Sequence, residues 1–283
     1  MRRKTAQLNE QERQRKMSQK TTLHRREVWD HFWQEREEIE QVYSNSERVI
    51  DQLIRLGDPA GKWILEVGAG SGRDSLALSS RGGRVIMLDY SAPALEVIQK
   101  LAQKTGRPVY LVRGDAFRLP FRSDALDLVF HQGLLEHFTA PEGILAENLR
   151  VLRPGGAALA DVPQRYHLYT AVKHLLIAFN RWFAGWETEF SRARLERLFA
   201  QTGFVRTEFY GEWMRPSFIY RASREALKKA GITLPLYPPS LPLFGRIRAG
   251  LRALLRRHPW HLNTVMDIGA IGFKPVGSDQ RAG

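Results

Sequence analysis

The sequence predicts an α/β fold built on a doubly wound, mostly parallel β-sheet. A short apolar run at 63–67 is followed by a glycine-rich turn and then by a helical pattern that starts at Asp74. A second apolar run, 84–88, ends at the carboxylate of Asp89, about 20 residues after the glycines. Apolar runs and helical patterns then alternate with short loops along the chain, which is typical of a parallel sheet.

The strands and helices can be placed in order along this core. We expect strands near 63–67, 84–88, 108–112, 125–130, 156–162, 203–210 and 266–273, and helices near 73–81, 92–104, 141–151 and 191–202. The first strand, its glycine turn and the following helix match the nucleotide-binding unit of Rossmann-like folds. In such a seven-stranded sheet the last strand is expected to insert antiparallel beside its predecessor.

Composition divides the chain into this core and several additions. We expect a basic disordered tail at 1–26, an N-terminal helical cap at 27–57, a core at 58–213 with an aromatic-rich insertion at 164–186, a Pro-rich segment and basic amphipathic helix at 214–264, a final core strand at 265–276 and a tail at 277–283. The expected fold is therefore a Rossmann-like, doubly wound sheet with N-terminal helices and helical insertions.

Positive charge is concentrated at both ends of the chain. The net charge of +13 divides into +6 for residues 1–27, −1 for 28–205 and +8 for 206–283. Basic flanks suggest contact with phosphate, on an anionic membrane surface or on nucleic acid, although they also fit a merely solvated surface. The helix expected around 243–257 pairs an apolar face with an arginine face, which fits a membrane interface or ordinary packing equally well.

Several classes of site are excluded or not expected. The chain has no cysteine, which excludes disulfides, thiolate zinc sites and a cysteine nucleophile. None of the eight histidines forms a pair at recognisable metal-ligand spacing, so no metal is expected. Without a secretory signal or an apolar run of about 18 residues, we expect a cytoplasmic protein, with peripheral membrane contact as an open alternative.

The glycine turn distinguishes between two kinds of cofactor. Its glycines are Gly68, Gly70 and Gly72, and Arg73 stands where a dinucleotide fingerprint has its third glycine. Glu66 lies at the strand end, where a pyrophosphate would meet an unfavourable negative charge. The turn therefore favours an adenosine ligand that carries a cationic group.

Four segments resemble motifs of one family. Residues 66–72 resemble motif I (E/D-x-G-x-G-x-G) of the class I S-adenosylmethionine-dependent methyltransferases. Further along, 114–121 resembles the "GDA-x-x-LPF" loop, 134–138 the "LEH" helix that follows the fourth strand, and 149–156 the "RVLKPGG" turn. The resemblance covers 63–163 and is closest to the broad "type 11" methyltransferase group.

The resemblance implies S-adenosyl-L-methionine as the cofactor. In the family's pattern Asp89 accepts the ribose hydroxyls, Asp115 accepts the adenine amino group, and Phe117 and Leu119 wall the ring. His137, in the "LEH" segment, is a candidate general base. The expected cofactor-binding residues are Glu66, Gly68, Ala69, Gly70, Asp89, Tyr90, Asp115, Ala116 and His131. Family members often use N-terminal helices as a lid, for which Trp29, Trp33 and Tyr43 are candidates.

These features predict in-line methyl transfer to a small-molecule or lipid-like acceptor, with the aromatics of 164–186 shaping its pocket. An RNA or other nucleic-acid methyltransferase fits less well, because His131-Gln132-Gly133-Leu134 replaces the N/D-P-P-Y/F motif of amino-methylating enzymes. A non-catalytic cofactor-binding module is a third alternative. Whether oxygen, nitrogen or carbon is methylated stays open, as does the oligomeric state.

Overall fold

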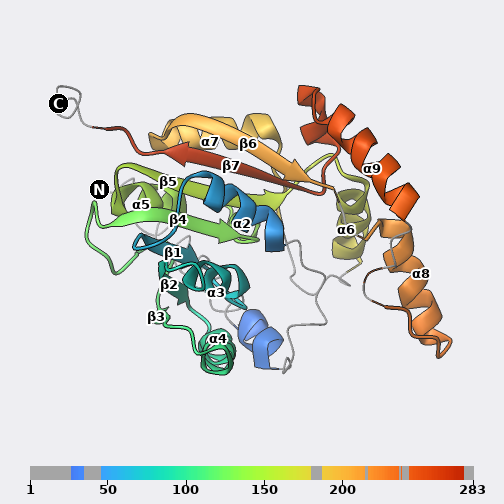
Figure 1. Ribbon diagram of the computed structural model, residues 1–283, viewed down its shortest axis with the longest axis horizontal. Coiled ribbons are helices and arrows are strands. Elements are labelled where there is room, and N and C mark those ends of the chain that lie inside the picture. The colour runs from blue at the N-terminus through green and yellow to red at the C-terminus, as the bar shows by residue number, and fades with distance from the viewer. Residues whose placement is uncertain are drawn as a thin grey trace, which may run out of the picture.

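The computed structural model describes residues 27–34, 46–179, 187–213, 216–235, 237 and 242–276 (Figure 1). Its centre is one seven-stranded sheet in the order β3-β2-β1-β4-β5-β7-β6. The strands are β1 (Trp63–Val67), β2 (Arg84–Asp89), β3 (Tyr110–Arg113), β4 (Leu126–Gln132), β5 (Leu152–Pro163), β6 (Val205–Glu212) and β7 (Asp267–Phe273). Strand β7 pairs antiparallel with both β5 and β6, and the other pairs are parallel. The predicted fold class is confirmed.

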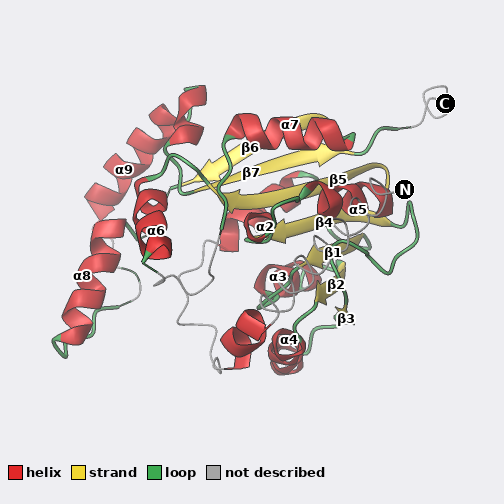
Figure 2. Ribbon diagram, turned by 180° about the vertical axis from the view of Figure 1, so that it is seen from behind, coloured by secondary structure: helices red, strands yellow, loops and turns green. Residues whose placement is uncertain are grey.

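Helices cover both faces of the sheet. On one face lie α2 (Ser46–Arg55), α3 (Arg73–Ser79) and α4 (Ala92–Thr105), in front of the sheet in Figure 1. On the other lie α5 (Glu142–Val151) and α7 (Arg192–Thr202), in front in Figure 2. Each layer buries apolar side chains against the sheet, such as Leu53 and Leu78 on the first face and Ile144 and Phe199 on the second. Burial of these two apolar cores stabilises the sheet, and the site lies at the carboxyl ends of its strands.

A third group of helices stands at one end of the molecule. It consists of α6 (Leu168–Ala178), α8 (Phe218–Lys229) and α9 (Pro242–Leu255), with the short 3₁₀ helix η3 (Pro259–Asn263) after α9. Both views place α6, α8 and α9 beyond the carboxyl ends of β4 and β5 (Figures 1 and 2). None of the described helices is both long and apolar enough to cross a membrane.

Two local features differ from the sequence prediction. Strand β5 begins at Leu152 rather than near 156, because the expected turn is a bulge within the strand: Gly155 has φ of 78° and the β4–β5 register shifts there. The "LEH" segment forms a 3₁₀ turn, η2 (Leu135–His137), rather than a longer helix. The predicted tails at 1–26 and 277–283, and most of the Pro-rich segment, lie outside the described residues.

Candidate functional site

The glycine turn after β1 takes the conformation that the sequence predicts. Gly68 and Gly70 have φ of 67° and 51°, in the left-handed region that glycine enters without strain. The backbone N–H groups of Gly68 and Ala69 donate to Leu88 O at 2.8 and 3.1 Å, which ties the turn to β2. A Cβ on Gly68 would lie 2.8 Å from Leu134 Cδ1, so the close approach also requires glycine.

Asp89 is fixed against this turn. Its Oδ2 accepts from the Gly70 N–H at 3.0 Å and its Oδ1 from the Ser91 N–H at 2.9 Å. Burial raises the pKa of Asp89, and the two backbone N–H groups oppose that effect. Each carboxylate oxygen retains a second lone pair, so the side chain can still accept hydroxyl groups. Tyr90 follows directly, and its carbonyl oxygen accepts from Arg113 Nε at 3.1 Å.

Two further carboxyl groups lie buried next to the glycine turn. Glu66 Oε2 and Asp74 Oδ1 are buried and have no hydrogen-bond partner in the described part of the chain. Burial, followed by the negative charge of Asp74, raises the pKa of Glu66 well above its usual range. Burial also raises the pKa of Asp74, to about 7. Unpartnered acidic oxygens at this place fit a cationic ligand, so the residues present suit S-adenosylmethionine.

The loop after β3 is anchored to β2 and leaves Asp115 exposed. The Gly114 N–H donates to Asp89 O at 3.0 Å, and Asp115 Oδ1 accepts from the Phe117 N–H at 2.9 Å. Phe117 is 40% exposed and meets Phe138 edge-on, with ring centroids 5.1 Å apart. Leu119, in contrast, is buried in the core, and its predicted place in a ring wall stays a prediction. Ala116 packs against that core.

Arg150 holds this loop in place, which sequence reasoning missed. Its guanidinium donates to the backbone oxygens of Phe121 (2.8 Å) and Leu119 (3.0 Å) and to Glu147 Oε1 (2.7 Å). Glu147 in turn accepts from the Leu119 N–H at 2.7 Å. The arginine of the "RVL" segment thus positions the loop that carries Asp115.

The helix at 27–34 lies directly on the glycine turn. A Cβ added to Gly70 would lie 2.8 Å from Trp33 Cζ2, so the indole contacts that glycine. Trp29 meets the His137 ring edge-on at 5.1 Å between centroids. This placement suits the lid predicted for Trp29 and Trp33, whose function stays a prediction, and Tyr43 lies outside the described residues.

The two histidines singled out from the sequence differ in their surroundings. His131 is completely buried, and neither ring nitrogen has a partner among the described residues; burial lowers its pKa to about 3, so the ring is neutral. Its side chain is enclosed on all sides, and contact with a cofactor remains a prediction. His137 is also buried, with Nδ1 4.0 Å from Glu187 Oε1.

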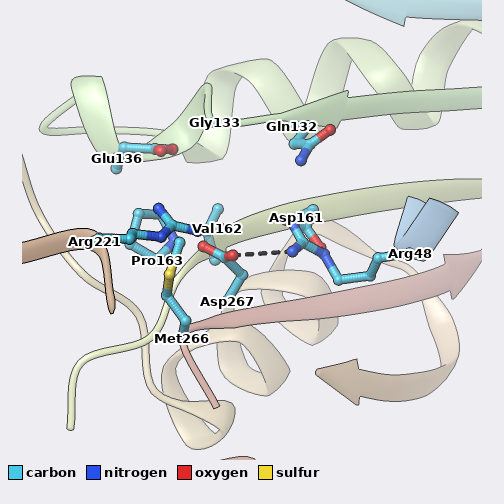
Figure 3. Close-up of a pocket in the computed structure, with 10 residues that line it drawn as sticks. All are labelled: Arg48, Gln132, Gly133, Glu136, Asp161, Val162, Pro163, Arg221, Met266 and Asp267. Atoms are coloured by element: carbon cyan, nitrogen blue, oxygen red, sulfur yellow. Dashed lines mark hydrogen bonds and ion pairs between the residues drawn. The ribbon is translucent and has the colours of Figure 1, made fainter. Parts of the chain in front are cut away.

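A cavity of about 170 Å³ opens where β4 and β5 end and β7 begins (Figure 3). Its lining is mostly polar and consists of Arg48, Gln132, Gly133, Glu136, Asp161, Val162, Pro163, Arg221, Met266 and Asp267. The described residues of the insertion after Pro163 do not line this cavity, and the prediction that the insertion shapes the acceptor pocket stays a prediction. The rest of that insertion, including Trp182, Phe183 and Trp186, lies outside the described residues.

A buried ionic network forms one wall of the cavity. Arg48 Nε donates to Asp161 Oδ2 and Arg48 Nη1 to Asp267 Oδ2, both at 2.9 Å (Figure 3). Burial disfavours charge on Arg48, but the two carboxylates outweigh it and raise its pKa. Gln132 links the network to α3, since its amide fits with the nitrogen 3.2 Å from Asp74 Oδ2 and the oxygen 3.0 Å from Arg48 Nη2. The cavity wall is therefore joined to the glycine-turn region by hydrogen bonds.

Glu136, in η2, is the cavity-lining carboxyl group with an orphaned oxygen. The side chain is only 4% exposed, and Oε2 has no hydrogen-bond partner among the described residues. Burial raises the pKa of Glu136 well above its usual range, and Glu187 adds to this while Lys173 opposes it. Lys173 forms ion pairs with two other carboxylates, because its Nζ lies 2.8 Å from both Glu187 and Glu189. The orphaned oxygen is thus left for a ligand that can donate a hydrogen bond.

Comparison with known proteins shows the family of the chain. Residues 65–160 match the methyltransferase domain family model. The demethylmenaquinone methyltransferase of Lactococcus lactis is 30% identical over 179 residues, which are 56% of this chain and 71% of the relative. The malonyl-[acyl-carrier protein] O-methyltransferase of Xylella fastidiosa is 34% identical over 41% of this chain and 40% of the relative. The chain belongs to the class I S-adenosylmethionine-dependent methyltransferases, whose cofactor is S-adenosylmethionine.

Other similarities are narrower. The match with three curated relatives spans only 40% to 53% of their own length. Among solved structures, Phospholethanolamine N-methyltransferase 2 of Haemonchus contortus has a TM-score of 0.56 at 20% identity, covering 81% of this chain and 53% of that one. The [4+2]-cyclase SpnF has the same TM-score at 22% identity, covering 82% and 81%. Because a cyclase has the same fold, the fold alone does not identify the acceptor, which has to be inferred from the site.

Proposed function

We propose that the protein transfers a methyl group from S-adenosylmethionine to a small-molecule or lipid-like acceptor bound in the cavity at the ends of β4 and β5. The observation that carries the proposal is the polar path from glycine turn to cavity, in which Asp74, Gln132 and Arg48 connect the two sites. The relatives act, by their names, on demethylmenaquinone and on malonyl-acyl-carrier protein. These names support a small-molecule or lipid-like acceptor.

Binding of the cofactor is assigned to residues around the glycine turn. Asp89 would accept the ribose hydroxyls, Asp115 the adenine amino group, and Glu66 would face the cationic part of the ligand. S-adenosylmethionine supplies a methyl group already activated by the positive sulfonium. The protein then contributes mainly alignment of the acceptor and exclusion of water, to which Trp33 on Gly70 would add.

Glu136 is the residue we assign to the acceptor's proton. An acceptor hydroxyl or amine in the cavity can donate to its orphaned Oε2. As the acceptor's lone pair forms the bond to the methyl carbon, the carbon–sulfur electrons stay on sulfur and the proton passes to the Glu136 carboxylate. Positive charge brought to this sheet edge favours the ionised form of Glu136, which burial otherwise disfavours. The general base first predicted, His137, lies next to Glu136 but does not line the cavity.

A methyl-transfer screen tests the function. Labelled S-adenosylmethionine is incubated with the protein and pools of quinones, phenols, polyprenyl lipids, sugars and total RNA. We expect label in one of the small-molecule or lipid pools. Label confined to RNA would favour a nucleic-acid methyltransferase, and cofactor binding without label in any pool would favour a non-catalytic module.

Two matched variants locate the chemistry once an acceptor is known. Glu136→Gln should lower kcat by about 10²–10⁴-fold, the usual contribution of a general base, and leave the affinity for S-adenosylhomocysteine unchanged. Glu142→Gln, an exposed glutamate at the start of α5, should change neither. Equal kcat in both variants would remove Glu136 from the mechanism.

The place of action is part of this proposal. A lipid-like acceptor partitions into bilayers, so an enzyme that methylates it gains from working at a membrane surface. We therefore propose a cytoplasmic protein that acts at the periphery of a membrane.

A further inference from the structure

In the helices beyond the cavity, several basic side chains form ion pairs with the body of the protein, and several apolar side chains face solvent. In α9, Arg252 Nη1 lies 3.6 Å from Glu212 Oε1, and Arg256, directly after the helix, has its Nη2 2.7 Å from Glu212 Oε2. Both guanidinium groups also lie over the Trp213 ring, 5.4 and 5.6 Å from its centroid. These arginines therefore attach α9 to the end of β6, and they face the body of the protein.

The apolar row of α9 faces solvent as a consequence. Ile247, Leu251 and Leu254 are 59%, 56% and 54% exposed. A surface helix of a globular protein normally turns its apolar stripe to the core and its charges to water. Here the arrangement is inverted, so no element among the described residues covers this apolar row.

Helix α6 repeats the inversion. Lys173 is 2% exposed and bonded inward to Glu187 and Glu189, whereas Leu168 and Leu175 are 68% and 60% exposed. Helix α8 adds Ile219 at 76%, and η3 adds Trp260 at 51%. Helices α6, α8 and α9 stand together at one end of the molecule (Figures 1 and 2), and η3 follows α9 in the chain. We call the exposed apolar residues of α6, α8, α9 and η3 the apolar end.

The charge around the apolar end indicates what covers it. Residues 216–257 contain nine arginines and lysines and a single acid, Glu225. Lys228, Lys229, Arg246 and Arg257 are exposed. Apolar side chains surrounded by exposed cations match the interface of an anionic bilayer, where the former enter the acyl boundary and the latter meet headgroup phosphates.

We propose that the apolar end docks the protein on an anionic lipid bilayer, with the cavity next to the membrane. Helix α8 connects the two, since its Ile219 is exposed at the apolar end while its Arg221 lines the cavity. The bilayer is then also the source of a lipid-like acceptor. That last step rests on the proposed function, whereas docking itself does not.

Vesicle co-sedimentation of the full chain tests the docking without cofactor or acceptor. The protein should bind vesicles of phosphatidylcholine with 30 mol% phosphatidylglycerol at low salt and bind pure phosphatidylcholine at least tenfold more weakly. Ile247→Glu/Leu251→Glu should reduce binding to the anionic vesicles at least tenfold, without loss of thermal stability, because both side chains are exposed. The matched control, Val205→Glu, changes a 47%-exposed apolar residue at the start of β6, at the opposite end of that strand from Glu212, and should bind like wild type.

Three results would overturn the docking. The first is no binding to the anionic vesicles at low salt. The second is binding of RNA that the double glutamate variant retains, with no vesicle binding, which would assign the basic charge to nucleic acid. The third is a concentration-dependent dimer in ultracentrifugation that the double variant abolishes, again without vesicle binding, which would make a second copy of the chain the partner. Vesicle binding without methyl transfer would leave the docking intact and count against the proposed function alone.

Discussion

Replacing Arg48 with methionine should expose how strongly the cavity wall depends on its buried ion pairs. Arg48 is 8% exposed and Asp161 is 1% exposed, so the substitution leaves a carboxylate in the interior without its cation. Removing one partner of a buried pair typically costs about 3–5 kcal/mol. We expect Arg48→Met to lower the free energy of unfolding by that amount at pH 8, measured by urea denaturation.

The loss should depend on pH in a definite direction. Burial already raises the pKa of Asp161 to about 6, and Arg48 is the charge that holds it down, so the variant's Asp161 should titrate higher still. A carboxyl group whose pKa is raised in the folded state favours folding at low pH and loses that advantage as pH rises through its folded pKa. The difference between wild type and Arg48→Met should therefore be largest near pH 8 and shrink toward pH 5.

A control on the same helix separates this effect from the loss of any arginine. Arg55 pairs with Glu208 at 3.0 Å, but its side chain is 55% exposed. Arg55→Met should cost at most about 1 kcal/mol, as expected for a surface pair. Adding Asp161→Asn to Arg48→Met should recover part of the stability. If Arg48→Met costs no more than Arg55→Met, or costs the same at pH 5 and pH 8, the reasoning about the buried network is refuted.

Three further predictions concern the cofactor and can be measured by calorimetric titration. Asp89→Ala should weaken S-adenosylhomocysteine binding by about 1–3 kcal/mol, because hydrogen bonds to a charged group are lost, and unchanged affinity would contradict the ribose assignment. Gly70→Ala should also weaken binding, since φ of 51° disfavours a side chain and the new Cβ would lie 2.8 Å from the indole of Trp33. Affinity for S-adenosylmethionine should rise from pH 6 to pH 8. The raised pKa of Glu66 keeps its carboxyl group protonated at low pH, whereas a cationic ligand favours the ionised form. A flat pH profile, or an equal rise in Glu66→Gln, would count against contact between Glu66 and the cationic part of the ligand.

The sheet was predictable because its signals are local. Strand β1 spans the predicted residues, and each of the other strands lies within four residues of its predicted start, since short apolar runs between turn residues specify buried parallel strands. The glycine turn could also be predicted, because left-handed φ values and a close approach by Leu134 leave little choice but glycine. Roles of Asp89 and Asp115 came from the family resemblance and remain to be tested.

The cavity wall could not be predicted, because its contacts join residues far apart in the chain. Arg48 is 113 residues from Asp161 and 219 from Asp267. In the sequence, Arg48 is one charge on a short polar helix and cannot be distinguished from the exposed Arg55, about two helical turns later. Only the antiparallel insertion of β7 beside β5 brings the two carboxylates together, and only the packing of α2 across them selects which arginine is buried.

Helix α9 shows a different limit of sequence reasoning. Helical periodicity assigns Ile247 and Leu251 to one face and Arg252 and Arg256 to another, and the structure agrees with that separation. Periodicity does not say which face turns inward; the usual rule, apolar inward, gives the wrong orientation here. The orientation depends on Glu212 and Trp213 at the end of β6, which offer the arginines a carboxylate and an aromatic face. Because an exposed apolar row costs free energy in water, the inversion is stable only if those contacts outweigh it or if another surface covers the row. Membrane docking meets the second of these conditions, while the contacts of the arginines with Glu212 determine which face α9 presents to the membrane. Glu212→Gln weakens those contacts, so it should reduce vesicle co-sedimentation although Ile247 and Leu251 are unchanged. Wild-type vesicle binding by this variant would contradict the assignment of the helix orientation to Glu212.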